Sequence, residues 1–434
     1  MRSLQQKTRI VILGGGAGGL ELAALLAGRK DLHVTLVDMV SSHLWKPRLH
    51  EFAAGTVSSS LSEISFYILG QLRGFHFEQG EVIGIDTQDR LVRLDAIRGP
   101  SKNNEQGEVL AGERTLPYDY CVVALGGVTP DFNTPGVAEN AIRLDGQPDA
   151  EYFRQHFIAE MIRARATGVP ADVVIIGSGA TGTELAAHLR HSERAFAHDD
   201  KPEQKLLNIT VLEAAPEIMP GAEESLRREL VQRLALLDIK VVTDARISEM
   251  QSDEIKTATG EKWPFDIAVW AAGLVGNPVL KTLGDFECDG SGRIKVDAFL
   301  RSTISDRVFV IGDSASFVPA GAEKPLPPTA QAASQQAHYL ADSLIRHLNG
   351  KLVEPFRYKH KGRLVSLAQA GVVGTIGRAR KRDLLIQGQF AIAAYDALQR
   401  QHQWRVLGPV RGSVAIAADL MSPTHGPPLK LHGG

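Results

Sequence analysis

Short apolar runs that end in a glycine turn recur along the chain, and each is followed by a segment with helical spacing. In the first copy, a β-branched run at residues 10–13 enters a glycine-rich turn at residues 14–19 and then a helical pattern at residues 20–27. The corresponding segments of the second copy are residues 173–176, 177–182 and 183–189. A short β-branched run predicts a buried strand, and apolar spacing of three and four predicts a helix. Both copies therefore predict the order strand, turn, helix.

A second pair of segments repeats in step with the first. Residues 118–126 carry aromatic, Asp, Val, Ala and Gly positions that return at residues 265–273. Two ordered repeats favour an α/β fold with two Rossmann-like dinucleotide-binding domains, one nested in the other. We expect the first domain to comprise residues 1–140 and 279–350 and the second to comprise residues 141–278. Residues 351–434 would form a C-terminal α+β region, in which short strands precede a mixed apolar and basic tail.

The first turn has the spacing GxGxxG, with Gly14, Gly16 and Gly19 at the three glycine positions. The first glycine permits a tight turn, the second lets a pyrophosphate approach the backbone, and the third lets the helix pack on the strand. The amino end of the helix presents free N–H groups to the phosphates. The next apolar run ends in Asp38, where a carboxylate can accept hydrogen bonds from a ribose. The turn is therefore predicted to bind a dinucleotide.

The second turn repeats the spacing at Gly177, Gly179 and Gly182. The strand that follows its helix ends in Glu213, beyond a charged stretch at residues 198–205 that is typical of a surface insertion. A carboxylate at this position binds a free 2′-hydroxyl and repels a 2′-phosphate, which favours NADH over NADPH. The nearby Arg190 and Arg194 could weaken that preference.

Two dinucleotide sites in one chain predict a tightly bound FAD and an exchangeable NADH, as in the two-dinucleotide-binding flavoproteins. Asp313 follows a buried strand, where it could bind the hydroxylated chain of the flavin or cap a helix. A helix that begins near Thr329 would direct its positive end at the flavin ring and stabilise the anionic reduced form.

Composition limits the other possibilities. The chain has 434 residues and a formal net charge of −2, so no overall field attracts nucleic acid, and we expect no such partner. The N-terminus has no apolar signal region, and no stretch approaches the ~18 apolar residues of a spanning helix. Any membrane contact should be peripheral, and the chain should offer no transmembrane proton path.

The cysteines and histidines also exclude several classes of site. Cys121 and Cys288 have no partner at CxxC or CxxxxC spacing, which argues against disulfide reductases and sulfide-oxidising flavoenzymes. This cysteine usage fits a reducing compartment. The 14 histidines form no tight ligand cluster in the sequence, so we expect no metal site.

Two longer motifs are more specific than the glycine turns: Trp-Lys-Pro-x-Leu-His-Glu at residues 45–51 and Ala-Gln-x-Ala-x-Gln at residues 330–335. Further matches at residues 12–21, 131–136, 179–185, 312–313 and 429–432 extend over nearly the whole chain. In these motifs the chain resembles the bacterial type II NADH dehydrogenases, single-subunit NADH:quinone oxidoreductases that do not pump protons. Arg48 and Thr329 depart from the family, which has Leu and often Arg there.

The resemblance implies hydride transfer from NADH to FAD and transfer of two electrons to a membrane quinone. It places Glu184 near the nicotinamide, where it would influence hydride or proton movement, and Gln331 and Gln335 at the quinone site. The FAD-binding positions would be Gly14, Gly16, Gly19, Asp38, Lys46, Val82, Ala124, Gly126, Asp313 and Ala330. The NADH-binding positions would be Gly177, Gly179, Gly182, Glu213 and Gly273. The C-terminal region would hold the protein on the cytoplasmic face of the inner membrane, and a homodimer is compatible with the family.

Simpler interpretations of the same residues stay open. Gln331 and Gln335, four apart on one helix face, could be a solvated stripe. Glu184 could be a first-turn partner of the helix dipole, and Trp45 a core aromatic. The segment around Leu398 could be a membrane anchor or an ordinary docking helix. The whole chain could be a soluble reductase with another acceptor, or a weakly active NADH-dependent sensor.

Overall fold

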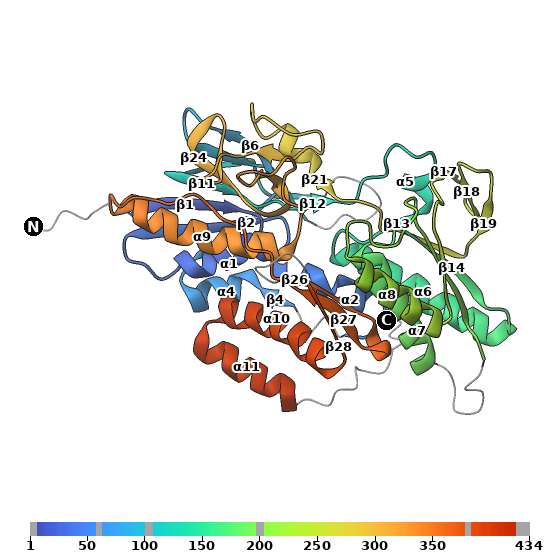
Figure 1. Cartoon of the computed structure of the whole chain (residues 1–434). Coiled ribbons are helices and arrows are strands. Elements are labelled where there is room, and N and C mark those ends of the chain that lie inside the picture. Colours follow the sequence, from blue (N-terminus) through green and yellow to red (C-terminus); the bar gives the residue numbers. More distant parts are fainter. Residues whose placement is uncertain (1–6, 58–62, 100–106, 197–203, 378–382, 422–434) are drawn as a thin grey trace, which may run out of the picture.

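Two parallel sheets form the centres of two α/β domains, and a smaller antiparallel sheet with two helices packs against both (Figure 1). The computed structural model describes residues 7–57, 63–99, 107–196, 204–377 and 383–421. The charged stretch at residues 198–205 lies largely outside these ranges, and the motif at residues 429–432 lies wholly outside them.

The first domain is built on a six-stranded sheet of order β23-β24-β11-β1-β2-β5, parallel except for β23. Its strands are β1 (Thr8–Leu13), β2 (Leu32–Asp38), β5 (His76–Gln79), β11 (Tyr120–Val123), β23 (Arg301–Ser302) and β24 (Ser305–Val310). Its main helices are α1 (Ala17–Leu26), α4 (Phe66–Arg73) and α9 (Ala330–Leu348). The central strands are apolar on both faces because helices cover one face and a meander covers the other. The meander consists of β6 (Val82–Asp86), β7 (Leu91–Leu94) and β10 (Arg114–Pro117).

The second domain repeats the design with a five-stranded parallel sheet of order β13-β20-β14-β15-β16. Its strands are β13 (Ile142–Arg143), β14 (Ala171–Ile176), β15 (Leu207–Leu212), β16 (Ile239–Val242) and β20 (Ile267–Trp270). Its helices are α5 (Val137–Asn140), α6 (Gln147–Thr167), α7 (Ala180–Phe196) and α8 (Glu224–Leu236), and its meander is β17 (Ile247–Met250), β18 (Glu254–Thr257) and β19 (Lys262–Pro264). The two strand-turn-helix repeats expected from the hydrophobic pattern thus occupy equivalent places in two sheets.

The second sequence repeat has the same structural role in both domains. The Asp119 carboxylate accepts a hydrogen bond from the Arg9 amide at 2.7 Å, and the Asp266 carboxylate accepts one from the Asp172 amide at 2.8 Å. In each domain, the acid before one strand therefore fixes the start of its parallel neighbour. The predicted α/β class, with one domain nested in the other, is confirmed.

The chain crosses between the domains twice, at β12 (Gly127–Val128) and β21 (Val275–Gly276), which pair antiparallel. The remaining short elements are β3 (Ser42–His43), β4 (Ile64–Ser65), β8 (Ile97–Arg98), β9 (Val109–Ala111), β22 (Ile294–Lys295), β25 (Ala315–Ser316) and α2 (Leu49–Ala53). The 3-10 turns in the described part of the chain are η1 (Lys46–Arg48), η2 (Pro278–Lys281), η3 (Gly312–Ser314) and η4 (Ala368–Ala370).

The C-terminal region consists of β26 (Gly362–Ser366), β27 (Val372–Ile376), β28 (Leu384–Gln387), α10 (Gln389–Leu407) and α11 (Pro409–Met421). Its sheet packs against α7 and α8 of the second domain, while α10 packs against α1 of the first (Figure 1). Short strands followed by a helical tail were expected here. None of the helices in the described part of the chain has the length and apolar character needed to cross a membrane.

Candidate active site

Each of the two glycine turns leaves open space beside its middle glycine. At Gly14 and Gly177 the backbone φ is +101° and +104°, and a Cβ would collide with the carbonyl region of Ala124 and Ala271, respectively. At Gly16, by contrast, a Cβ would meet no protein atom within 4 Å. The same is true of Gly179. The protein itself does not need glycine at these middle positions, whereas a phosphate lying on the backbone does. Both turns therefore fit the pyrophosphate of a dinucleotide.

The acids at the second strands close the two turns in the same way. The Asp38 carboxylate accepts hydrogen bonds from the amides of Gly15 at 2.6 Å and Val40 at 3.0 Å. Burial raises the pKa of Asp38, while these amides and the Lys46 ammonium favour its charged form. Asp38 therefore lies where the first turn and the second strand meet, as a ribose ligand would.

Glu213 has the equivalent position in the second domain. Its carboxylate accepts hydrogen bonds from the amides of Ser178 and Ala215, each at 2.9 Å. Arg190 cannot offset its charge, because the guanidinium donates to the carbonyls of Leu237 and Asp238, next to the amino end of β16. Glu213 follows the carboxyl end of β15. Because β15 and β16 are parallel, this is the opposite end of the strands from Arg190. The suggestion that Arg190 weakens the preference for NADH is wrong.

Residues around the first turn form the wall where a flavin would lie. Asp313 is in the single turn η3 after β24, so it does not cap α9, whose N-cap is Thr329. Burial raises the pKa of Asp313, and the Lys46 charge opposes this shift. The positive charge of Lys46 thus acts on both Asp38 and Asp313.

The other expected FAD-contact positions lie around the first turn, and Gly273 lies at the corresponding place in the second domain. Val82 begins β6, with its side chain buried in the core, close to the end of β2 because the Gly80 amide donates to the Asp38 carbonyl. Gly126 and Gly273 follow β11 and β20 at equivalent places. The list is completed by Ala124, which is packed against the first turn, and Ala330, which is the first residue of α9.

The two glutamines of α9 hold a backbone segment that leads into β26. Gln331 accepts hydrogen bonds from the Lys361 amide and the Tyr358 hydroxyl, both at 2.9 Å. Gln335 exchanges two hydrogen bonds with the backbone of Lys359, at 2.9 and 3.0 Å. They are therefore not a solvated stripe. Their amides fix the segment at residues 358–362 beside the amino-terminal half of α9.

Glu184 is buried at the junction of three parts of the chain. It lies beyond the first turn of α7 and accepts a hydrogen bond from the Ser366 amide of β26 at 2.9 Å, so it is not a first-turn dipole partner. Its other oxygen lies 3.6 Å from Nδ1 of His50. Burial raises the pKa of Glu184 to about 8, with a further contribution from the charge of Glu51. The burial of this carboxyl therefore favours its protonated form.

The neighbouring groups of α2 complete this junction. His50, Glu51 and His188 each offer a ligand atom within 4.8 Å of the others, an arrangement that could hold a metal ion. Glu51 already binds Arg48 at 2.8 Å and the Tyr395 hydroxyl at 3.1 Å, and both nitrogens of His188 face hydroxyl groups. Most of the ligand capacity is thus used by protein partners, and the expectation of no metal stays a prediction.

Comparison with known proteins agrees with this geometry. The family of pyridine nucleotide-disulphide oxidoreductases matches residues 8–337. A type II NADH:quinone oxidoreductase from Haemophilus influenzae is 34% identical over 448 aligned residues, covering 98% of this chain and 99% of that protein. The chain belongs to the type II NADH:quinone oxidoreductases. A member of this family from Staphylococcus aureus is 28% identical over 385 residues, covering 86% of this chain and 90% of that protein.

Solved structures support the fold of this type II NADH:quinone oxidoreductase family member. The structure of NDH2 from Plasmodium falciparum in complex with NADH has a TM-score of 0.78 at 19% identity and covers 98% of this chain. A sulfide:quinone oxidoreductase from Aquifex aeolicus has a TM-score of 0.74 at 17% identity and covers 96%. In this chain Cys121 and Cys288 are both free thiols. Burial raises the pKa of Cys121, which lies inside β11.

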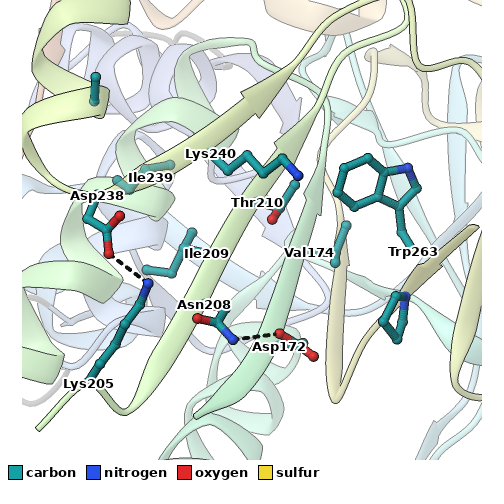
Figure 2. Close-up of a pocket in the computed structure, with 12 residues that line it drawn as sticks. Asp172, Val174, Lys205, Asn208, Ile209, Thr210, Asp238, Ile239, Lys240 and Trp263 are labelled. Atoms are coloured by element: carbon teal, nitrogen blue, oxygen red, sulfur yellow. Dashed lines mark hydrogen bonds and ion pairs between the residues drawn. The ribbon is translucent and has the colours of Figure 1, made fainter.

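A separate pocket of about 460 Å³ lies in the second domain of this family member, away from the glycine turn (Figure 2). It is found at the amino ends of β14, β15 and β16, where Lys205 pairs with Asp238 at 2.7 Å and the Lys240 ammonium lies 4.4 Å from the centre of the Trp263 ring. Nucleotides bind at the carboxyl ends of such strands. This pocket is therefore no part of the dinucleotide site.

Three residues at the candidate site escaped the sequence interpretation. Gln336 is buried and accepts a hydrogen bond from the Gly312 amide at 2.7 Å, next to Asp313. Tyr395 reaches Glu51 from α10, and His402 stacks on Trp45 with ring centres 3.7 Å apart. Trp45 is half-buried against this ring and is not a plain core aromatic. Of these three residues, only Gln336 had a signal in the nearby sequence, because it directly follows the Ala-Gln-x-Ala-x-Gln motif at residues 330–335.

Proposed function

We propose that the chain transfers a hydride from NADH to FAD and passes two electrons to a membrane quinone, without pumping protons. The observation that carries this proposal is the pair of open middle glycines, Gly16 and Gly179, at the carboxyl ends of two parallel sheets. The names of the relatives, NADH:quinone oxidoreductases, support the choice of donor and acceptor. FAD, when bound, supplies the hydride acceptor and the route for electrons onward.

Each cofactor has its own set of proposed residues. FAD is held by Gly14, Gly16, Gly19, Asp38, Lys46, Val82, Ala124, Gly126, Asp313 and Ala330. NADH is held by Gly177, Gly179, Gly182, Glu213 and Gly273. Glu213 sets the preference for NADH, because its charge repels a 2′-phosphate and Arg190 is engaged at the other edge of the sheet. The amino end of α9 supplies positive potential beside the flavin. The Thr329 side chain caps this end by accepting a hydrogen bond from the Ala332 amide.

The reaction requires one proton besides the hydride, because quinone takes up two electrons and two protons whereas NADH delivers two electrons and one proton. Glu184 is suited to hold this proton, since its pKa is raised to about 8 and its second oxygen faces His50. Gln331 and Gln335 border the quinone site and fix residues 358–362 as its wall. Their role is thus to shape the site as well as to meet the substrate.

The C-terminal region is proposed to hold the enzyme on the cytoplasmic face of the inner membrane. Several large apolar side chains of α10 and α11 are exposed: Phe390, Leu398, Trp404, Val410 and Val414. A homodimer is part of the same proposal. The domain boundaries at residues 140, 278 and 350 are part of the proposal, supported by the pairing of β13 with β20. Helix α5, which ends at residue 140, packs against β17 and marks the point where the chain enters the second domain.

Stopped-flow spectroscopy of the purified protein tests the function directly. We expect NADH to bleach the flavin absorbance and a short-chain quinone to restore it. Bleaching without restoration by quinone would favour a soluble reductase with another acceptor. Very slow bleaching despite tight NADH binding would favour a sensor.

Matched substitutions in the two turns separate the cofactor sites. Gly16→Val should give a folded but colourless protein, because the new side chain fills only the space of the pyrophosphate. Gly179→Val should give a yellow protein whose flavin NADH reduces at least 100-fold more slowly at a fixed NADH concentration, roughly the loss expected when a bound ligand is displaced. If both variants lose colour, or neither does, the assignment of one cofactor to each turn is wrong.

A further inference from the structure

A buried chain of hydrogen bonds connects the first glycine turn to helix α10. The Gly15 carbonyl lies 2.8 Å from Nδ1 of His43, and Nε2 of His43 lies 3.1 Å from Nε2 of His402. Nδ1 of His402 lies 2.9 Å from an oxygen of Glu21. The residues His43, His402 and Glu21 are 4%, 5% and 1% exposed. Two ends of the sequence thus meet in a site that excludes water, directly behind the turn.

The contacts require a specific number of protons. A carbonyl only accepts, so His43 must carry hydrogen on Nδ1. Glu21 is ionised: burial raises its pKa, but the hydrogen bonds from His402 and Ser334 and the nearby His338 ring lower it by more. His402 must therefore carry hydrogen on Nδ1 as well. The contact between the two Nε2 atoms needs one hydrogen more, so when the chain is fully bonded the two rings hold three protons and one positive charge. Because the pKa of His402 is lowered from its ordinary value of 6.5, this form is filled on the acidic side of that value.

The extra proton belongs on His402. Burial lowers the pKa of both rings, and it lowers that of His43 to about 3. At His402 the adjacent Glu21 carboxylate opposes the effect of burial, while Arg405 adds to it. His402 then donates from both nitrogens, to Glu21 and to the neutral His43. This distribution satisfies each hydrogen bond in the chain.

Glu21 connects the same chain to helix α9. Its second oxygen accepts a hydrogen bond from the Ser334 hydroxyl at 2.6 Å and lies 3.4 Å from the Arg405 guanidinium and 3.6 Å from Nε2 of His338. Ser334 belongs to the specific glutamine motif at the start of α9. One buried carboxylate therefore joins α1, which begins at the glycine turn, to α9 and α10.

We propose that His402 is a positioning residue for FAD, which through His43 fixes the Gly15 carbonyl and the phosphate-binding turn. The inference rests on the proposed FAD site. Its consequence is that docking of the C-terminal helix and retention of the cofactor are coupled. His402 touches no cofactor atom in this proposal and acts only through His43.

Release of FAD from the full-length holoenzyme after dilution, followed by flavin fluorescence, measures this coupling. His402→Phe keeps a ring against Trp45 but removes both donors, so we expect FAD to bind about 10-fold more weakly, the effect of losing one buried hydrogen bond. Val406→Ala is the matched control. Val406 lies on α10, one turn after His402, and is fully buried in the hydrophobic core of the first domain, and its side chain makes no polar contact. It should weaken packing without removing the proton.

The pH profile separates positioning from packing. Rising pH removes the shared proton and breaks the link, so wild-type FAD release should accelerate with pH through a single step, which lies below pH 6.5 because the pKa of His402 is lowered from that value. The charged or titratable groups that face His402 are Glu21 on α1, His338 on α9, Arg405 on α10 and His43 on β3. The step should persist in Val406→Ala and disappear in His402→Phe. Glu21→Gln, which keeps shape but not charge, should move the step to lower pH.

The outcomes distinguish the positioning role of His402 from a packing effect and from a failure of the proposed FAD site. If His402→Phe keeps wild-type FAD affinity and pH profile, the positioning role is refuted. If Val406→Ala also abolishes the step, the effect belongs to packing and the proposal fails. If His402→Phe does not fold, an unmoved step in Glu21→Gln refutes the proposal instead. Failure of the wild-type protein to bind FAD would refute the proposed function itself.

Discussion

Two buried acids of this chain have opposite protonation, and their partners explain why. Glu21 and Glu184 are 1% and 6% exposed. Glu21 is surrounded by hydrogen-bond donors, which lower its pKa, whereas Glu184 has a single backbone donor, Ser366, and its pKa rises to about 8. Burial alone therefore does not decide the charge of a carboxylate. The first acid is suited to a fixed structural role and the second to exchange of a proton.

Replacement of Glu184 should change how stability depends on pH. A carboxylate with a folded-state pKa near 8 and an ordinary value of 4.5 when unfolded binds a proton more readily in the native state between those values. The free energy of unfolding then decreases as pH rises from 4.5 towards 8, by at most about 1.4 kcal/mol per pH unit. Glu184→Gln removes this contribution and should flatten the decrease.

Thermal unfolding of wild type and Glu184→Gln between pH 5 and pH 8, expressed as a difference in midpoint at each pH, measures the effect. Glu51→Gln is a second test, because the charge of Glu51 contributes to the raised pKa of Glu184: its removal should lower that pKa and end the decrease in stability at a lower pH. A wild-type profile with the same slope as the Glu184→Gln profile would mean that Glu184 is ionised throughout this range.

At the scale of elements, the strands and glycine turns were the most predictable part. Each turn is encoded by one continuous stretch, residues 10–38 and residues 173–213, because the strand, the glycines and the acid of one βαβ unit are close in sequence. Contacts of α10 were not predictable. His402 lies 359 residues from His43, and no periodicity within α10 identifies which histidine will face a distant turn. The roles of Gln331 and Gln335 as backbone ligands were equally hidden, since a glutamine pair gives the same pattern on a solvated face.

Helix α10 is a docking helix, which is one of the two alternatives that the sequence left open, and its role as a membrane anchor stays a prediction. His402 and Val406 are buried against the first domain, which makes it a docking helix. Leu398 and Trp404 are 50% and 46% exposed, and they are available to a lipid surface. Truncation of the helix would therefore disturb the FAD site as well as any membrane contact, so substitutions on the exposed side are the better test.

We expect Leu398→Glu with Trp404→Glu to reduce binding to vesicles that contain anionic lipid by 10-fold or more, since burial of one large apolar side chain contributes about 1.5–3 kcal/mol. Flotation of the protein with such vesicles measures the change. Gln401→Glu adds a similar charge at an exposed position of the same helix and should have little effect. Loss of binding in this control would attribute the change to charge and not to apolar contact.

At the scale of the whole molecule, transfer of a hydride depends on how two separately built sites face one another. The chain passes between the domains at β12 and β21, whose pairing joins Gly127 to Gly276 and Val128 to Val275. These strands lie next to the ends of β11 and β20, so a shift between them would move the nicotinamide relative to the flavin while leaving each turn intact. The sequence repeat predicted two domains, but it carried no information on this pairing, because each crossing strand has only two residues.

Gly127→Ala tests whether the crossing sets the rate. A Cβ on Gly127 would lie 2.5 Å from the Val275 carbonyl oxygen, so the two strands must separate. Because hydride transfer needs the reacting atoms about 3–3.5 Å apart, and misplacement by about 1 Å costs roughly 100-fold in rate, we expect flavin reduction by NADH to slow by about that factor in stopped-flow measurements. FAD should be retained, since Gly14, Gly16 and Gly19 are unchanged.

Gly112→Ala, at an exposed site with no atom within 4 Å of the added Cβ, is the control and should react at the wild-type rate. Unaltered reduction in Gly127→Ala would show that the second domain finds its reactive position independently of this strand pair, and loss of FAD would show that the pair supports the flavin site instead.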